Sequence, residues 1–244
     1  MAKVYIGTSG YSYPHWSDGV FYPSGLYQPK WLEFYAENFN TVELNVTFYR
    51  LPAKKVFEGW YGRTPKDFLF VVKGSRFITH IKRLKNVEEP ISLLFDRALA
   101  LKEKLGMILW QLPPSLKVDT KRLEQFLKLL KTQSKSRYTF EFRNQSWFTD
   151  KIYELLKKYN AALCIADSPS FPKEEVVTAD FVYVRFHGGT ELYGSNYSDK
   201  ELSNWAQKIK KWTKQNLDVY CYFNNDAYGY AIQNARTLKD LVKK

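Results

Sequence analysis

Four residues in this sequence carry the groups most often used for acid–base catalysis: Glu43, Glu141, Asp167 and His187. Each lies in, or at the end of, a short hydrophobic segment. Carboxylates and imidazole donate and accept protons near neutral pH when their surroundings adjust their pKa values. Glu43 and Glu141 also form a carboxylate pair, which at the right separation serves as acid and base in glycoside hydrolysis. These four residues are therefore the candidate catalytic residues.

A divalent metal is an open alternative for part of this set. Glu141, Asp167 and His187 end three consecutive hydrophobic segments and combine carboxylate with imidazole, as metal sites in sugar isomerases and epimerases do. Arg143 and Arg185 lie in the same segments and would disfavour a cation beside them. The chain has only three histidines, too few for a multinuclear zinc cluster. No cofactor is evident from the sequence.

Positive charge gathers near the same segment ends, at Lys73, Arg143 and Arg185. The stretch that follows Lys73 reads KGSRFITHIKRLKN (73–86) and adds Arg76, then Lys82, Arg83 and Lys85, with Phe77 and His80 interleaved. Basic residues mixed with aromatic ones are typical of phosphate contacts and base stacking. An ordinary exposed loop has a similar composition. The pattern indicates an anionic partner, either a small molecule or a nucleic acid.

Further candidate substrate-binding residues are hydroxyl, amide and aromatic side chains near the same ends. Hydroxyl and amide groups hydrogen-bond ligand oxygens, and aromatic rings on loops can stack on a ligand, although they more often pack in the core. The candidates are Thr8, Ser9, Tyr11, Trp16, Asn45, Gln111, Trp147, Asn224 and Asn225.

The elements that position these residues alternate between strand-like and helix-like patterns. Strands are expected over residues 4–8, 42–46, 68–73, 107–111, 138–143, 162–167, 181–187 and 218–223. Helical patterns lie near 30–38, 53–61, 91–104, 119–133, 149–158, 200–215 and 228–242. The proline-marked stretch SPSFPKEEVV predicts a reduced helix six between strands six and seven. Eight such repeats predict a single (β/α)8 barrel of the TIM type, class α/β, spanning residues 1–244.

An open doubly wound sheet is the alternative, but it usually carries a glycine-rich phosphate turn after its first strand. The stretch GTSG (7–10) does not match G-x-G-x-x-G, and no P-loop is present. The strand count also favours the barrel.

Alternation within the strands selects which side chains face the barrel axis. In TVELNV, YTFEFR and FVYVRFH, apolar and polar residues alternate, so that each strand has one apolar face and one polar face. The polar face of each strand should point to the barrel axis near the carboxyl ends, where barrel enzymes place their active sites. An internal ion-pair network is the structural alternative, with Glu43, Glu141 and Asp167 opposite Lys73, Arg143 and Arg185.

Composition bears on the kind of partner and on the cellular compartment. The net charge is +12, much of it from lysines in helical patterns on the expected outer ring, so the charge alone is weak support for a nucleic-acid partner. No apolar run is long enough to cross a bilayer and no signal peptide is recognisable, so we expect a cytoplasmic protein that does not bind membranes. The oligomeric state is not predicted. Cys164 and Cys221 lie in apolar strand patterns and are expected to be buried thiols.

Several motifs together resemble one protein family. They are VYIGTSGYSYPHW (4–16), FNTVELNVTFYRLP (39–52), FVVKGSRFITH (70–80), WQLPPS (110–115), FEFRNQSW (140–147), VYVRFHG (182–188) and FNND (223–226). Together they span most of the chain and are similar to the YecE-like family, a domain-of-unknown-function family. The resemblance implies a TIM-like barrel and supplies no established reaction.

Three functions stay open at this point. The first is an enzyme, such as a hydrolase, that acts on a phosphate-bearing substrate or a nucleic acid at the C-terminal face of the barrel. The second is a carbohydrate isomerase, epimerase or glycosidase. The third is a barrel that binds a ligand without turnover.

Overall fold

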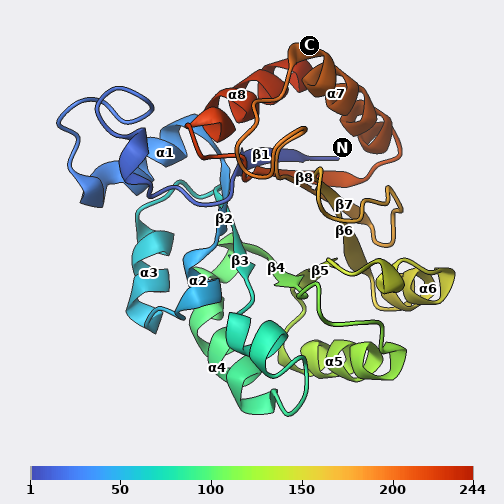
Figure 1. The fold of residues 1–244 in the computed structure, drawn as a ribbon. Coiled ribbons are helices and arrows are strands. Elements are labelled where there is room, and N and C mark those ends of the chain that lie inside the picture. The colour runs from blue at the N-terminus through green and yellow to red at the C-terminus, as the bar shows by residue number, and fades with distance from the viewer. Residues whose placement is uncertain (1, 244) are drawn as a thin grey trace.

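The computed structural model describes residues 2–243. Its centre is one sheet of eight parallel strands in the order β1-β8-β7-β6-β5-β4-β3-β2 (Figure 1). The strands are β1 Val4–Thr8, β2 Thr41–Leu44, β3 Leu69–Lys73, β4 Leu105–Gln111, β5 Arg137–Glu141, β6 Ala161–Asp167, β7 Phe181–Phe186 and β8 Asp218–Phe223. A TIM-type barrel is therefore confirmed.

Helices surround the strands (Figure 1). The α-helices are α1 Trp31–Asn38, α2 Val46–Tyr49, α3 Lys54–Gly62, α4 Glu88–Ala98, α5 Thr120–Gln133, α6 Asp150–Lys158, α7 Asp199–Lys214 and α8 Tyr230–Lys243. Short helical turns are η1 Pro14–Trp16, η2 Gln28–Lys30, the π-turn η3 Phe77–Ile81, η4 Leu99–Lys104 and η5 Gln145–Trp147. Within residues 2–243, no helix is long and apolar enough to cross a membrane.

The barrel closes between β1 and β2, where regular pairing is reduced to a single bridge from Ser9 to Glu43. The hydroxyl of Tyr35, from α1, completes the seam. It accepts from the amide nitrogen of Thr8 at 3.0 Å and donates to the carbonyl oxygen of Thr41 at 3.1 Å. Gly7 is required here because a Cβ would lie 2.3 Å from the Thr41 oxygen. A side chain thus replaces the missing ladder bonds.

The strands separate two cores. The larger lies between the sheet and the helices. It contains the alternate, apolar side chains of β2, β5 and β7, such as Val42, Phe140 and Val184. The smaller fills the barrel interior with Tyr5, Val71, Met107, Leu109, Ala162, Cys164, Phe181, Tyr183, Tyr220 and Tyr222. Both cysteines are buried free thiols, as expected. The predicted alternation in these three strands is confirmed.

The structure departs from the predicted elements in the segments after β2 and β3. Strand β2 ends at Leu44, two residues early, because Asn45 adopts a helical backbone and starts the single turn α2. The hydroxyl of Thr47 then donates to the carbonyl oxygens of Leu44 and Lys73, which fixes α2 against β3. The turn η3 was also not expected. Residues 168–180, all of them described, contain no helix, so the helix expected between β6 and β7 is absent, in line with its predicted reduction.

Candidate functional site

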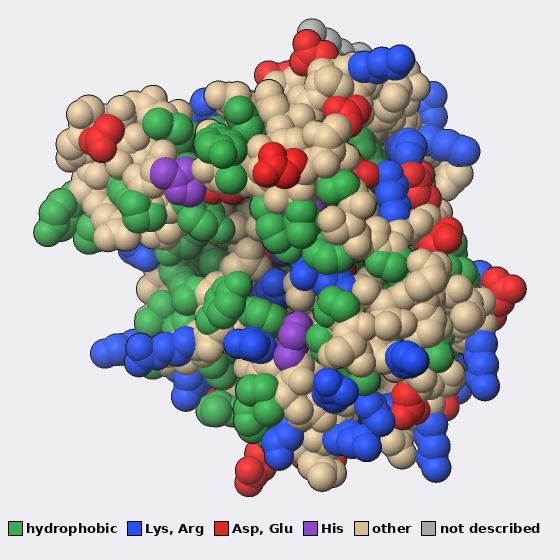
Figure 2. All heavy atoms as spheres, viewed as in Figure 1, with side chains coloured by type: hydrophobic (Ala, Val, Ile, Leu, Met, Phe, Trp, Pro, Cys, Tyr) green, Lys and Arg blue, Asp and Glu red, His purple; other side chains and the backbone are tan. Residues whose placement is uncertain are grey.

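A hollow of about 700 Å³ opens at the carboxyl ends of the strands. Figure 2 shows it near the middle of the molecule, with Lys and Arg side chains in its depth and a His on its rim. Its lining comes from the segments after β1, β2, β3, β4, β5, β7 and β8. The lining residues are Tyr13, His15, Asn45, Phe48, Tyr49, Lys73, Arg76, His80, Gln111, Arg143, Tyr193, Asn224, Asp226 and Ala227.

A fully buried ion-pair network lies inside the barrel beside the hollow, centred on Arg185 of β7. Its guanidinium donates to Glu43 of β2 at 2.8 and 2.9 Å, and to Glu141 of β5. Tyr183 adds a hydrogen bond to Glu43 at 2.6 Å. Burial alone would raise the pKa of both carboxyls, but Arg185 and the other cationic and hydrogen-bonding neighbours together outweigh burial and lower both pKa values, that of Glu141 well below its usual range. Both carboxylates are therefore ionised at neutral pH.

Arg143 connects this network to the hollow. Its Nε donates to Glu141 at 2.7 Å, one terminal nitrogen donates to Tyr193, and the guanidinium lies 4.0 Å from the ring centre of Phe171. With 13% of its side chain exposed, Arg143 also lines the hollow. Glu141 thus orients a cation that a ligand can reach.

His187 is buried between Arg185 and Asn224. Its Nε2 lies 3.4 Å from a nitrogen of Arg185 and 3.7 Å from Glu141, and its Nδ1 lies 3.2 Å from the amide of Asn224. Burial and then Arg185 lower the pKa of His187 to about 4. The imidazole is consequently neutral at physiological pH, and it does not line the hollow.

Lys73, at the end of β3, is the cation without a counter-ion. It is 7% exposed and its Nζ lies 4.3 Å from the ring centre of Phe48. Among residues 2–243 no carboxylate lies within ion-pair distance of this nitrogen. Burial, followed by the charge of Arg185, lowers the pKa of Lys73 to about 7. This amine can therefore exchange its proton close to neutral pH.

A second group that titrates near neutrality, Asp226, follows β8. Its carboxylate accepts from Trp16 Nε1 at 2.9 Å and lies 2.9 Å from Nε2 of His15. Burial raises the pKa of Asp226 to about 6, against the opposing effect of Trp16 and His15. Both Asp226 and His15 line the hollow. Segments 211 residues apart in the sequence thus meet at its edge.

Two groups of the predicted residues lie in or beside the hollow. Asn45, Lys73, Arg76, Gln111, Arg143 and Asn224 line the hollow. Glu43, Glu141, Arg185 and His187 lie together in the buried network and do not line it. The placement of Arg185 among the ligand contacts therefore does not match the structure, because its guanidinium is bound by two carboxylates.

Asp167 does not lie where the sequence suggested. Leu163 and Ile165 of β6 pack in the outer core. Asp167 lies on the same face of the strand, so its side chain points outward. There it pairs with Lys173 at 2.7 Å and accepts from Trp205 at 3.2 Å. The predicted metal set of Glu141, Asp167 and His187 is thereby divided between two sides of the sheet. Across the described residues no group of three His, Cys, Asp or Glu side chains could hold a metal.

Several other candidates have structural positions. Trp16 and Trp147 are fully buried, and Trp147 stacks on Phe142 with ring centres 4.8 Å apart. The Thr8 hydroxyl donates to the carbonyl oxygen of Gly10. The amide of Asn225 points to Ser195 and Asn234. The remaining two are Ser9, which is buried, and Tyr11, which accepts from Trp60 beside the hollow.

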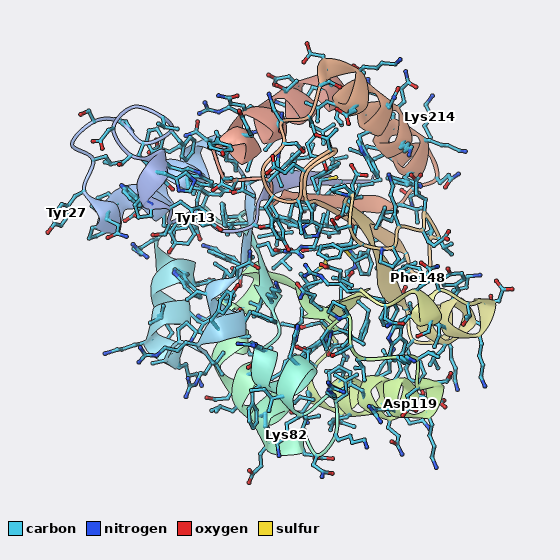
Figure 3. The ribbon with its side chains drawn as sticks, in the orientation of Figure 1. Tyr13, Tyr27, Lys82, Asp119, Phe148 and Lys214 are labelled. Atoms are coloured by element: carbon cyan, nitrogen blue, oxygen red, sulfur yellow. The ribbon has the colours of Figure 1, made fainter. Side chains whose placement is uncertain are left out.

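Of the Arg and Lys residues that follow Lys73 in the basic loop, Arg76 alone lines the hollow, together with the interleaved His80. Lys82 lies 5.6 Å from the ring centre of Phe77 and appears at the lower edge of Figure 3, away from the centre. Arg83 donates to Ser115 at 3.2 Å. Lys85 lines a separate outer groove next to α5. The loop is therefore not one continuous cationic surface at the site.

Sequence reasoning missed several lining residues: Tyr13, His15, Phe48, Tyr193 and Asp226. Phe48 and Tyr193 carry no chemical signal of their own. The motifs around 4–16 and 223–226 did contain Tyr13, His15 and Asp226, so motif membership was the available signal.

Comparison with known proteins agrees with this architecture. The family described as "Protein of unknown function DUF72" matches residues 5–244. The chain belongs to the DUF72 family. It is 27% identical to UPF0759 protein YunF of Bacillus subtilis, over 98% of this chain and 94% of that protein. It is 26% identical to UPF0759 protein YecE of Escherichia coli, over 99% and 93%. The YecE-like resemblance is confirmed.

A solved relative has the same fold. The crystal structure of a DUF72 family protein from Thermotoga maritima superposes with a TM-score of 0.86 at 30% identity, covering 99% of this chain and all of that one. A DUF72 family protein from Enterococcus faecalis gives a TM-score of 0.81 at 19% identity, covering 99% and 96%. Neither description names a reaction, so the chemistry must be argued from the site.

Proposed function

We propose that this DUF72 protein is an enzyme that acts on a phosphate-bearing substrate bound in the hollow. The observation that carries the proposal is an excess of positive charge. Three cations, the buried Lys73 and Arg185 and the partly exposed Arg143, face two carboxylates, Glu43 and Glu141, which leaves one positive charge unbalanced whenever Lys73 is protonated. Arg76 adds a further cation on the lining. Buried charge is costly unless it is compensated, and a bound phosphate would compensate this one.

The geometry assigns different parts to the cations. Glu141 accepts a hydrogen bond from the Nε of Arg143 and so holds its guanidinium in place, while Lys73 has no acidic partner among residues 2–243. A planar guanidinium matches two phosphate oxygens, and an ammonium acts as a point charge beside them. We therefore propose that Lys73, Arg76 and Arg143 bind the phosphate. The network around Arg185 positions them.

We further propose that the reaction is hydrolysis. Lys73 and Asp226 both line the hollow and both titrate near neutral pH. In this reaction water attacks phosphorus and gives its proton to the carboxylate of Asp226. The phosphorus–oxygen bond to the leaving group breaks, and that oxygen takes a proton from the ammonium of Lys73.

The carbohydrate alternative that uses Glu43 and Glu141 as its carboxylate pair receives less support. A glycosidase needs one carboxyl kept protonated, with a raised pKa. Here Arg185 lowers the pKa of both Glu43 and Glu141, and neither residue lines the hollow. The isomerase variant requires a metal set that the structure does not bring together.

The test combines binding with turnover. Titration calorimetry with inorganic phosphate should show binding by the parent and a loss of at least tenfold in affinity for Arg76→Ala. Arg83→Ala, in the same loop but outside the hollow, is the matched control. Asp226→Asn should retain binding and lose hydrolysis of phosphomonoester and phosphodiester substrates. Equal binding by the Arg76 and Arg83 variants would refute the phosphate site. Binding without turnover in the parent would leave only the non-catalytic alternative.

A further inference from the structure

A second pocket, of about 420 Å³, adjoins the hollow. Tyr13, Asn45 and Tyr49 line both, so the two spaces are neighbours. Figure 2 shows hydrophobic side chains next to the hollow on the side of α2 and α3, and Figure 3 labels Tyr13 near the centre. The complete lining is Gly10, Tyr11, Ser12, Tyr13, Leu44, Asn45, Val46, Tyr49 and Trp60. We call this space the aromatic pocket.

The short helix α2 presents apolar side chains to this pocket. Val46 and Tyr49 are three residues apart and therefore lie on one face of the turn. They are 49% and 76% exposed, although both are apolar or aromatic. Phe48, on the other side, is buried beneath Lys73. An exposed apolar face that borders a cationic hollow is typical of a ligand contact.

Several polar groups of the aromatic pocket already have partners. The Tyr13 hydroxyl donates to the carbonyl oxygen of Ser9 at 2.5 Å, and the Asn45 amide donates to the same oxygen at 3.1 Å. The Tyr11 hydroxyl accepts from Trp60 Nε1 at 3.0 Å, whereas the Oδ1 of Asn45 has no partner within residues 2–243. A sugar would need hydrogen bonds for its many hydroxyls and would find few free partners here. A flat apolar face, such as a nucleobase, fits this lining better.

We propose that the aromatic pocket binds the base of a nucleotide whose phosphate lies in the cationic hollow. The phosphate half rests on the proposed function, whereas the base half rests on the exposed face of α2 and the pocket's engaged polar groups. Tyr49 contributes to both spaces and is the expected stacking partner. The ligand class is thus a nucleotide unit, which is either a free nucleotide or an accessible nucleotide of a single-stranded nucleic acid.

The experiment compares ligands that differ by one part, using titration calorimetry on the full chain. The probes are adenosine 5′-monophosphate, ribose 5-phosphate and adenosine. The nucleotide should bind more tightly than ribose 5-phosphate by roughly 5- to 150-fold, the factor that corresponds to one base–aromatic stack. Tyr49→Ala should remove that advantage and leave the affinity for ribose 5-phosphate unchanged.

Tyr27→Ala is the matched control, because Tyr27 is also 76% exposed but lies at the outer edge of the molecule (Figure 3). It should bind all three probes like the parent. Equal binding of nucleotide and ribose 5-phosphate, with both weakened by Arg76→Ala, would overturn the base site and leave the phosphate site standing. Binding of neither phosphorylated probe would overturn the proposed function itself.

A further arm separates the two sources of a nucleotide unit. The mononucleotide is compared with a single-stranded octanucleotide at several salt concentrations. Tighter binding of the octamer, with a steeper fall in affinity with salt, assigns the unit to a strand. Equal or weaker octamer binding assigns it to a free nucleotide. In both cases Tyr49→Ala must weaken the better ligand, and an unchanged affinity in that variant would overturn the base site.

Discussion

Replacing Lys73 by Met should stabilise the fold while weakening anion binding. Met has a similar length and no charge. Within the described residues the Nζ of Lys73 has no acidic partner, so the substitution would leave no buried carboxylate unpaired. The buried ammonium therefore costs free energy in the empty protein. Such a cost is expected for a group retained for function and not for one retained for stability.

The magnitude follows from the pKa of Lys73, which burial and Arg185 lower from 10.5 to about 7. At 1.36 kcal/mol per pKa unit this amounts to about 5 kcal/mol as an upper bound. The sign is set by proton binding: between pH 7 and 10.5 the unfolded chain holds a proton that the folded chain has lost. Because the unfolded state binds more protons there, the free energy of unfolding rises with pH across this window.

The measurement is urea unfolding of the parent and Lys73→Met between pH 6 and 10.5. Subtracting the two curves of unfolding free energy against pH cancels the contributions of the other titrating groups. We expect the variant to be more stable by about 2–5 kcal/mol at pH 6 and equal to the parent near pH 10.5. Lys128→Met, on the exposed face of α5, is the control for loss of one charge. Parallel curves for parent and Lys73→Met, or a less stable variant at pH 6, would refute the reasoning.

Three further predictions concern the network, the seam and the ligand. Glu141→Gln should lose about 3–5 kcal/mol in urea unfolding because Arg143 and Arg185 lose an ionised partner, and a loss below 1 kcal/mol would contradict this. Tyr35→Phe should lose about 1–3 kcal/mol and speed hydrogen exchange at the Thr8 amide; unchanged exchange would mean the hydroxyl does not close the seam. Sulfate, which does not titrate in this range, should bind more weakly as pH rises from 7 to 9 while Lys73 deprotonates, and Lys73→Met should remove most of that dependence in calorimetry.

The fold could be predicted because each repeat carries its own local signal. Strands β2, β5 and β7 alternate apolar and polar residues, and this alternation alone predicts that Glu43, Glu141 and Arg185 point into the barrel. Strand β6 reads AALCIAD and is apolar on both faces, so its parity could not be read and Asp167 was placed on the wrong side. Alternation is informative only where the two faces differ in polarity.

The lining of the site was harder to predict because much of it comes from segments outside the strands. Asp226 and His15 meet across the chain through contacts that no local pattern encodes. Trp16 and Trp147 show the converse: each looks like a loop aromatic available for stacking, yet both are fully buried. Whether a loop aromatic packs or binds depends on tertiary contacts, which sequence spacing does not supply.

The interior of the barrel differs sharply between its two ends, and this difference supports a functional site over a structural network. Tyr5, Val71 and Met107 belong to the apolar interior cluster, whereas Glu141 and Arg185 bury charge near the carboxyl ends of the strands. Replacing a buried ion pair with apolar residues is often neutral or stabilising, so stability alone does not explain the charges. A network that fixes a partly exposed guanidinium instead prepares the site in advance for an anion, because the cation need not reorganise when the ligand binds. The unbalanced charge at Lys73 would then have a physical reason, because the phosphate that we propose would complete the network.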